Sequence, residues 1–184
     1  MAGAILVAGT LVVAFLVHRH PGPDALDQWV FSVVGPAPHS SRLIHLTDLG
    51  AVPVAVGGSV LAAVVAVGRD RRTALACLVG PGLALVLVEW VLKPTVARYY
   101  FGVLSFPSGT ITAVAAVATA WVVAVPGWLR VPVLVVGAGL VASTSVAVIA
   151  LRWHYPSDAL AGGAFGVGVV LLLDGVLHGA GARR

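Results

Sequence analysis

The feature that most constrains this chain is a series of long apolar stretches, each bounded by charged residues, proline or glycine. A helix that crosses a bilayer needs roughly 17–25 mostly apolar residues. The apolar stretches come near this requirement, and they predict an all-α, integral membrane bundle of six helices within one domain, residues 1–184. The six expected spans are residues 4–17, 43–68, 73–92, 110–125, 131–151 and 158–177.

The composition supports a membrane protein and argues against other classes. Apolar residues make up 59% of the chain and charged residues 10%, whereas a typical soluble domain carries about 25% charge. A soluble enzyme, a disordered tail, a collagen-like fibre and a disulfide scaffold are therefore disfavoured. The net charge of +4 does not indicate nucleic-acid binding, because the basic residues flank apolar segments and form no runs with interleaved aromatics.

Two segments near the N-terminus need separate interpretation. Residues 4–17 could be a signal peptide, but no basic n-region precedes them and no small-residue cleavage site follows, so an uncleaved span is favoured. Residues 18–42 are too polar to span. Within them, residues 23–31 predict a short interfacial helix with Asp24 as N-cap and Trp29 as membrane anchor.

Polar residues beside the apolar stretches are functional candidates, because ionisable groups are costly in a membrane. Glu89 and Lys93 are four residues apart, so they share a helix face and can pair. Pro94 should end or kink that helix, which leaves Lys93 and Arg98 at the membrane edge. The alternative is that these cations reach to lipid head groups without a catalytic role.

A second and a third cluster combine helix starts with reactive side chains. Ser108 and Gly109 precede an apolar helix, so Ser108 is a natural N-cap and the free N–H groups could bind an anion, or simply begin an ordinary helix. His154 and Asp158 are four residues apart, and a carboxylate at that spacing can hold one imidazole nitrogen while the other acts as nucleophile or base. The alternative is an interfacial histidine beside a capping aspartate.

A fourth pair, His45 and Asp48, alone indicates a structural polar contact. Taken together, the clusters supply cations, amide donors and an imidazole, which is the set needed to hold a phosphate and attack it. A metal site is less well supported, since His154 and Asp158 give only two ligands with no partner motif.

The ordered clusters resemble the three signature blocks of the type 2 phosphatidic acid phosphatase superfamily, which are K-x6-R-P, P-S-G-H and S-R-x5-H-x3-D. The resemblance covers residues 89–162. Lys93 fits the first block, residues 107–109 the second, and His154 with Asp158 the third. The sequence departs from the blocks at several positions: Tyr100 replaces Arg, Phe101 replaces Pro, Thr110 replaces His, and Ala147 with Val148 replace Ser-Arg.

The resemblance implies a role for each matching residue. His154 would attack phosphorus and form a phosphohistidine, and Asp158 would fix its tautomer. The phosphate would be bound by Lys93, Ser108, the Gly109 N–H and Thr110, with Arg98 and Arg152 as substitutes for the absent family arginines. In this family the histidine at the position of Thr110 acts as the general acid that protonates the leaving group. Threonine cannot do this, so His45 is an alternative proton donor.

The implied function is hydrolysis of a lipid phosphate or polyprenyl diphosphate, without a metal or other cofactor. Diphosphates should be favoured, since their leaving group is a weaker base than an alkoxide. A non-catalytic lipid-phosphate binder or transport accessory, and a small channel or transporter, are the rival functions. Expected partners are the substrate and membrane lipids, with no nucleic acid, in a monomer or homodimer. The G-x-x-x-G of Gly162 and Gly166 fits packing within the bundle or a dimer seam.

Loop charges predict the orientation in a cell membrane. With the cations of the expected site set aside, six arginines fall on one side and two on the other, so both termini are expected in the cytoplasm and the site outside. The inner set is Arg69, Arg71, Arg72, Arg130, Arg183 and Arg184, and the outer set is Arg19 and Arg42.

Overall fold

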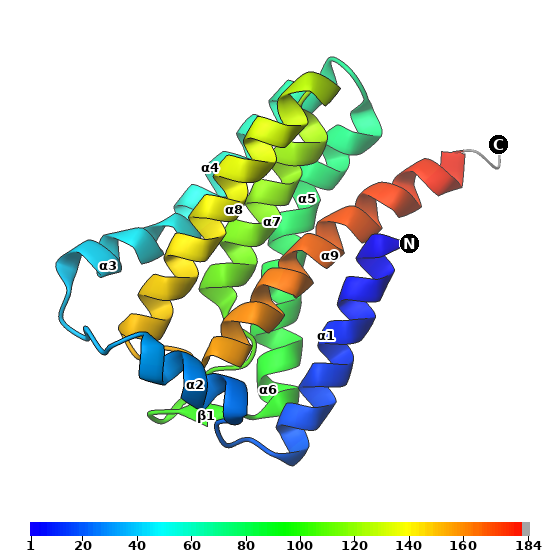
Figure 1. The fold of residues 1–184 in the computed structure, drawn as a ribbon. Coiled ribbons are helices and arrows are strands. Elements are labelled where there is room, and N and C mark those ends of the chain that lie inside the picture. Colours follow the sequence, from blue (N-terminus) through cyan, green and yellow to red (C-terminus); the bar gives the residue numbers. More distant parts are fainter. Residues whose placement is uncertain (182–184) are drawn as a thin grey trace.

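The computed structural model describes residues 1–181, which form an almost entirely helical bundle (Figure 1). Arg183 and Arg184, used in the charge prediction, lie outside the described residues. A short antiparallel hairpin pairs Tyr99 with Leu104 and Tyr100 with Val103. The elements are α1 (Ala2–Arg19), α2 (Ala25–Val33), α3 (Ser41–Thr47), the 3₁₀ helix η1 (Asp48–Gly50), α4 (Val52–Val67), α5 (Arg71–Leu87), the π-helical η2 (Val88–Leu92), α6 (Lys93–Val96), β1 (Tyr99–Tyr100), β2 (Val103–Leu104), α7 (Gly109–Ala124), α8 (Gly127–Ala150) and α9 (Pro156–Gly181).

Helix α7 lies at the centre of the bundle and contacts α4, α5, α8 and α9. Small residues allow the close approach of α7 and α9. A Cβ added to Gly162 would lie 2.5 Å from the Ser108 carbonyl oxygen, and one added to Gly166 would lie 2.5 Å from that of Thr112. The Thr112 hydroxyl also donates to the Gly162 carbonyl at 3.1 Å. The G-x-x-x-G motif therefore packs inside the bundle, as membrane helices with small faces commonly do.

The chain is a multi-pass integral membrane protein. Within residues 1–181, four helices are long and apolar enough to cross a bilayer, namely Ala2–Arg19, Arg71–Val96, Gly127–Ala150 and Pro156–Gly179. A fifth crossing is available if the bent pair Ser41–Gly50 and Val52–Val67 counts as one span. The remaining expected span, residues 110–125, corresponds to α7, which is shorter, and its 16 residues cover about 24 Å. Because α7 is surrounded by other helices, its length need not match the lipid.

Two expected helices differ from the sequence prediction. Residues 43–68 were expected to form one span, but the chain bends by 46° where η1 gives way to α4. Here Gly50 packs so tightly on α7 that an added Cβ would lie 2.6 Å from the Thr110 side chain. Pro94 was expected to end or kink its helix, yet helical structure continues to Val96. The preceding turn is π-helical, a form that usually occurs as a single widened turn.

The predicted interfacial helix is present as α2, and its start is capped as expected. The Asp24 carboxylate accepts from the Asp27 N–H at 2.7 Å, and the Asp27 carboxylate accepts from the Asp24 N–H at 3.3 Å, which completes a capping box. Trp29 is exposed on this helix. Asp27, by contrast, is fully buried and reaches the core of the bundle.

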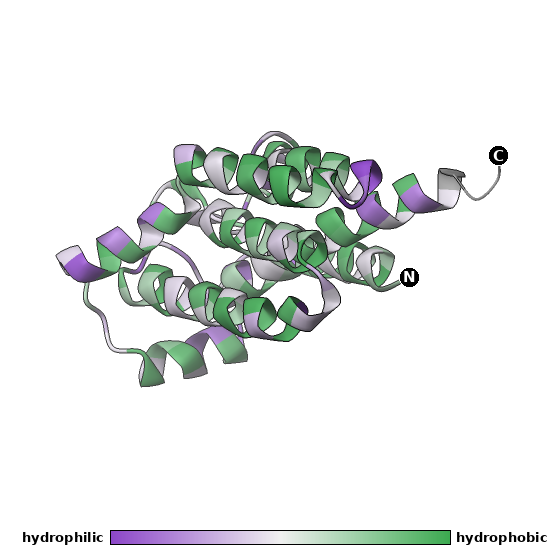
Figure 2. Cartoon of the chain, turned by 90° about the horizontal axis from the view of Figure 1, so that it is seen from above, coloured by the Kyte–Doolittle hydropathy of each residue, from purple (hydrophilic) through white to green (hydrophobic). Residues whose placement is uncertain are grey.

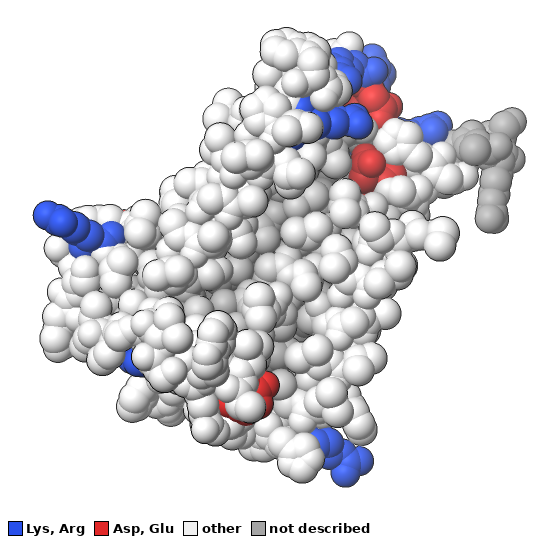
Figure 3. Space-filling model, viewed as in Figure 1, with Lys and Arg blue, Asp and Glu red and all other residues white. Residues whose placement is uncertain are grey.

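Polar and apolar residues are separated along the bundle. In the view from above, most of the helical surface is hydrophobic and the strongly polar residues are concentrated at a few helix ends and on α2 and α3 (Figure 2). The space-filling view shows charged side chains at the two ends of the visible face and few between them (Figure 3). This distribution matches a protein whose middle zone faces lipid.

Candidate active site

An open cavity of about 700 Å³ brings together residues from three distant parts of the chain. Lys93 comes from the end of the long α5–α6 segment, Tyr100 from the hairpin, and His154 from the α8–α9 connection. The cavity is lined by Pro38, Lys93, Tyr100, Phe101, Val103, Leu104, Leu151, Arg152, Trp153 and His154.

The end of α8 directs the chain toward the cavity. Arg152 has a left-handed backbone with φ of 59°. The Trp153 N–H donates to the Val148 carbonyl and the Arg152 N–H donates to the Ile149 carbonyl, both at 3.0 Å. These two bonds form a Schellman motif, which ends a helix and reverses the local chain direction. His154 follows immediately.

The His154 ring is held by the backbone just before the P-S-G turn. Its Nδ1 lies 2.9 Å from the Ser105 carbonyl oxygen. Since a carbonyl can only accept, Nδ1 carries a proton, and in the neutral ring the lone pair is on Nε2. The nearest Asp158 oxygen lies 3.8 Å from Nδ1, so the carboxylate is close but does not make the direct hydrogen bond that the sequence led us to expect. The Ser105 carbonyl is therefore the group that fixes the tautomer.

The P-S-G turn joins the start of α7 to the start of α9. The Ser108 N–H donates to the Asp158 carbonyl at 3.0 Å, and the Ser108 hydroxyl accepts from the Ile111 N–H at 3.5 Å, as expected for an N-cap. This pairing places the turn beside the segment that carries His154. The predicted meeting of distant blocks is thus present in the fold.

The Glu89–Lys93 pair lies directly against Gly109. The Lys93 ammonium is 2.7 Å from one Glu89 carboxylate oxygen and 2.9 Å from the other. A Cβ added to Gly109 would overlap that carboxylate and would lie 3.7 Å from the Lys93 Nζ. The predicted pair is present, and a glycine is required for its approach to the start of α7.

Arg98 does not contact the cavity, contrary to the sequence prediction. Its side chain is 1% exposed and its five N–H donors have five acceptors, so none remains for a phosphate. The left-handed Ala97, with φ of 52°, ends α6 and turns Arg98 inward. The guanidinium donates to the Pro21 and Gly22 carbonyls, the Ser157 hydroxyl and the carboxylates of Asp27 and Asp158.

Arg152 lines the cavity but is engaged in holding α2. Its guanidinium donates to the carbonyls of Phe31 at 3.3 Å and Val34 at 3.2 Å. It also lies over the Phe31 ring, 4.0 Å from the centroid. Cations at a helix C-terminus stabilise the unpaired carbonyls there. Its predicted contact with phosphate would have to share these donors.

Of the predicted site residues, only Lys93, Arg152 and His154 line the cavity. Ser108, Gly109 and Asp158 are buried behind its wall. Thr110 and His45 lie farther from it. Thr110 packs against Gly50 and is absent from the cavity wall. His45 pairs with Asp48 at 3.3 Å, but its side chain is 79% exposed on α3 and does not line the cavity. Neither residue is therefore placed to donate a proton to a ligand bound beside His154.

Sequence reasoning missed Asp27, and it favoured Tyr100 as a membrane-interface anchor, although Tyr100 is close enough in sequence to line the site. Asp27 is fully buried, where it pairs with Arg98 at 2.8 Å and accepts from the Ser157 N–H at 2.8 Å. Only its position in the capping box marked it in the sequence. Tyr100 lies in the cavity wall and packs against Tyr155, with 4.4 Å between ring centroids. Burial raises the pKa of the Tyr100 phenol, so it stays a neutral hydrogen-bond donor.

Within residues 1–181, no group of three or more His, Cys, Asp or Glu side chains is placed to hold a metal ion. No protein-family model and no curated protein matches the sequence. The structure resembles the crystal structure of the first transmembrane PAP2-type phosphatidylglycerolphosphate phosphatase from Bacillus subtilis. The TM-score is 0.71 at 21% sequence identity, covering 95% of this chain and 94% of that one. This chain therefore has the fold of a transmembrane PAP2-type phosphatase.

Proposed function

We propose that the protein hydrolyses a lipid phosphate or diphosphate, with His154 as the nucleophile. The observation that carries the proposal is the bond from His154 Nδ1 to the Ser105 carbonyl, because it leaves the Nε2 lone pair available beside Lys93 in one cavity. PAP2-type phosphatases provide the matching fold, and the order of the sequence blocks provides the matching residues.

The proposed reaction has two steps. Nε2 attacks phosphorus, the bond from phosphorus to the leaving oxygen breaks, and a phosphohistidine forms. Water then attacks phosphorus, the P–N bond breaks, and inorganic phosphate is released with return of the imidazole. The carboxylate of Asp158, 3.8 Å from Nδ1, stabilises the positive ring that exists between the two steps.

The cavity supplies a limited set of phosphate donors. Lys93 provides the cation, and Glu89 must give up part of its hold on that ammonium when an anion binds. Gly109, at the start of α7, lies next to Lys93 but behind the cavity wall, so its N–H adds a donor only when an anion displaces the Glu89 carboxylate. Tyr100 stands where the resembling family has an arginine, and we assign its phenol a neutral hydrogen bond to phosphate.

Because the sequence lacks the family's general-acid histidine, we expect one class of substrate to react faster than others. Since neither Thr110 nor His45 reaches the cavity, the leaving group departs with little help from an acid. In a polyprenyl diphosphate the leaving group is a phosphate monoester, a much weaker base than the alkoxide lost from phosphatidic acid. We therefore propose diphosphate lipids as better substrates, with the cavity facing the outer side of the membrane.

Phosphate release from purified protein tests the proposal. A polyprenyl diphosphate, phosphatidic acid and phosphatidylglycerolphosphate are supplied in detergent with a chelator present, and His154→Ala is compared with the parent. His20→Ala is the matched control, because the exposed His20 side chain makes no hydrogen bond with residues 1–181. We expect release by the parent and His20→Ala, fastest with the diphosphate, and loss with His154→Ala.

Each alternative outcome has a distinct meaning. Release that survives His154→Ala would eliminate the proposed nucleophile. Equal rates on the diphosphate and on phosphatidic acid would contradict the argument from the leaving group. Binding of all lipids without any release would favour the rival function, a lipid-phosphate binder or transport accessory that retains the cavity but has no turnover.

A further inference from the structure

A second polar cavity, of about 270 Å³, lies at the opposite end of the bundle from His154. It is formed where α4 and α7 end, where α8 begins and near the end of α9. Arg69 and Arg130 both line it, together with Asp70, Thr73 and His178. Charged side chains gather at this end in the space-filling view (Figure 3).

The acidic residue in this cavity is already neutralised by local contacts. Asp70 caps α5, accepting from the Thr73 N–H at 2.9 Å and the Thr73 hydroxyl at 2.7 Å. These bonds hold the pKa of its carboxyl below the usual range. The His178 Nε2 lies 2.9 Å from the same carboxylate. Asp70 is thus an anchor for α5 and α9 rather than a counter-ion for the two arginines.

The two guanidinium groups keep most of their donors available. Arg69 donates one bond, to the Ala124 carbonyl at 3.2 Å. Arg130 makes no hydrogen bond and no ion pair with any residue in the described part of the chain. Arginine presents five N–H donors in a planar fork that matches the geometry of a phosphate. Two such groups in one cavity favour an anionic ligand.

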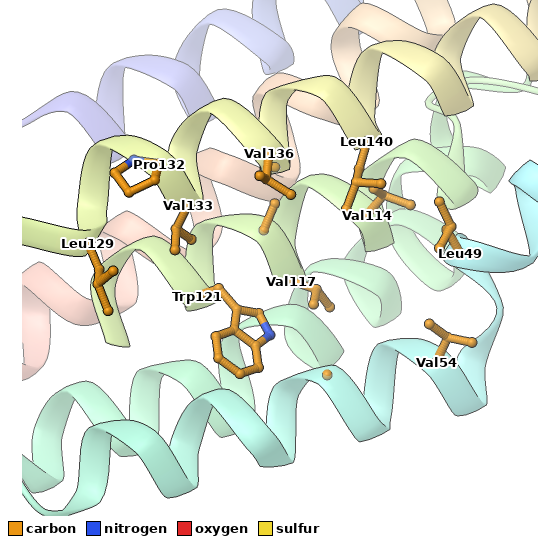
Figure 4. A pocket seen from close by; sticks show the side chains of 13 residues that line it. Leu49, Val54, Val114, Val117, Trp121, Leu129, Pro132, Val133, Val136 and Leu140 are labelled. Carbon is orange, nitrogen blue, oxygen red and sulfur yellow. The ribbon is translucent and has the colours of Figure 1, made fainter. Parts of the chain in front are cut away.

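An apolar groove of about 440 Å³ begins beside this cavity and runs along the membrane zone between α4, α7 and α8 (Figure 4). Trp121 and Leu129 line the half of the groove nearer the polar cavity, and Leu49 and Leu140 line the other half (Figure 4). On α8 the positions from Leu129 to Leu140 extend over about 16 Å. The groove therefore has the length and chemistry of an acyl-chain site.

The groove and the polar cavity are adjacent in the fold. Leu129 of the groove directly precedes Arg130 of the cavity on α8. Trp121 of the groove lies one helical turn before Ala124 of the cavity on α7. We propose that the pair binds an anionic phospholipid of the leaflet opposite His154, with its phosphate on Arg69 and Arg130 and one acyl chain along α8. This proposal does not depend on hydrolysis at His154.

Lipid binding to the purified full chain tests the proposal. Native mass spectrometry follows titration with phosphatidylglycerol, with phosphatidylcholine of the same chain length, or with inorganic phosphate. The head-group variant is Arg69→Gln with Arg130→Gln. Its matched control is Arg71→Gln with Arg72→Gln, which removes the same charge at the same end outside the cavity. The groove variant is Val136→Trp, matched by Val135→Trp, a neighbour that is similarly exposed but outside the groove.

We expect phosphatidylglycerol to bind in preference to phosphatidylcholine. The head-group variant should lose at least about tenfold in affinity, since hydrogen bonds to charged groups are the stronger class. Val136→Trp should also weaken binding, and both control variants should bind as the parent does. Equal losses in Arg71→Gln/Arg72→Gln would show a diffuse surface charge and overturn the site. Equal occupancy by inorganic phosphate, or unchanged binding in Val136→Trp, would overturn the assignment to a lipid.

Discussion

The Arg98→Met protein should unfold at a much lower temperature than the parent, because Arg98 stabilises two buried carboxylates. Asp27 and Asp158 are both fully buried, at 2.8 and 2.6 Å from its guanidinium. Removing one partner of a buried ion pair costs about 3–5 kcal/mol, since the remaining charge has no compensation. For a chain of this size, 1 kcal/mol shifts Tm by about 2–4 °C, so a fall of about 6–20 °C is expected.

The assay is thermal unfolding in detergent, followed by the fluorescence of a thiol probe or by circular dichroism. The matched control is Arg42→Met, because Arg42 is exposed on α3 and makes no ion pair with the described residues. Adding Asp27→Asn to Arg98→Met should recover part of the loss, because one buried charge is then removed. A stable Arg98→Met protein that only binds phosphate less tightly would refute this account and restore Arg98 to the phosphate site.

Three further predictions concern packing and the cavity. Gly162→Ala should lower Tm by about 2–12 °C, because the added Cβ would meet the Ser108 carbonyl and overpacking costs about 1–3 kcal/mol. In the same thermal unfolding experiments, the control Gly175→Ala should leave Tm equal or slightly higher, since its Cβ would meet no atom within 4 Å. Glu89→Gln should lower the inhibition constant of inorganic phosphate by up to about 5-fold, since a partly exposed ion pair contributes about 0.2–1 kcal/mol and its loss frees the Lys93 ammonium. A higher constant would contradict that role. Tyr100→Phe should lower kcat/KM about 2–10-fold, as loss of one neutral hydrogen bond costs about 0.5–1.5 kcal/mol, and an unchanged value would remove the phenol from the site.

The helical content and membrane character could be predicted from the sequence, because long apolar stretches leave few other folds in a bilayer. The Asp24 cap and the Glu89–Lys93 pair were also predictable, since both depend on spacing within one helix. The bend before α4 was not, because it depends on how closely η1 packs on α7. That contact joins residues that are distant in the sequence.

In the candidate site, too, features set by local spacing were predictable, whereas contacts between distant residues were not. The expected order of spans placed the His154 segment and the P-S-G segment at the same face of the membrane, and the bond from His154 to the Ser105 carbonyl shows that the two segments meet. Spacing also suggested that Arg98 would lie free at the membrane edge, but the left-handed Ala97 turns it into the core. The buried Asp27 partner comes from the interfacial helix, so no pattern within the signature blocks could have revealed it. Long-range charge pairing is decided by tertiary packing.

The most direct test of the central claim is to trap the covalent intermediate. The purified protein is mixed with a polyprenyl diphosphate labelled at its terminal phosphate, quenched rapidly under alkaline conditions, digested and analysed by mass spectrometry. The account predicts labelled phosphohistidine at His154, formed within the first turnover and absent from His154→Gln. Steady phosphate release with no label at His154, or label on a different residue, would contradict it.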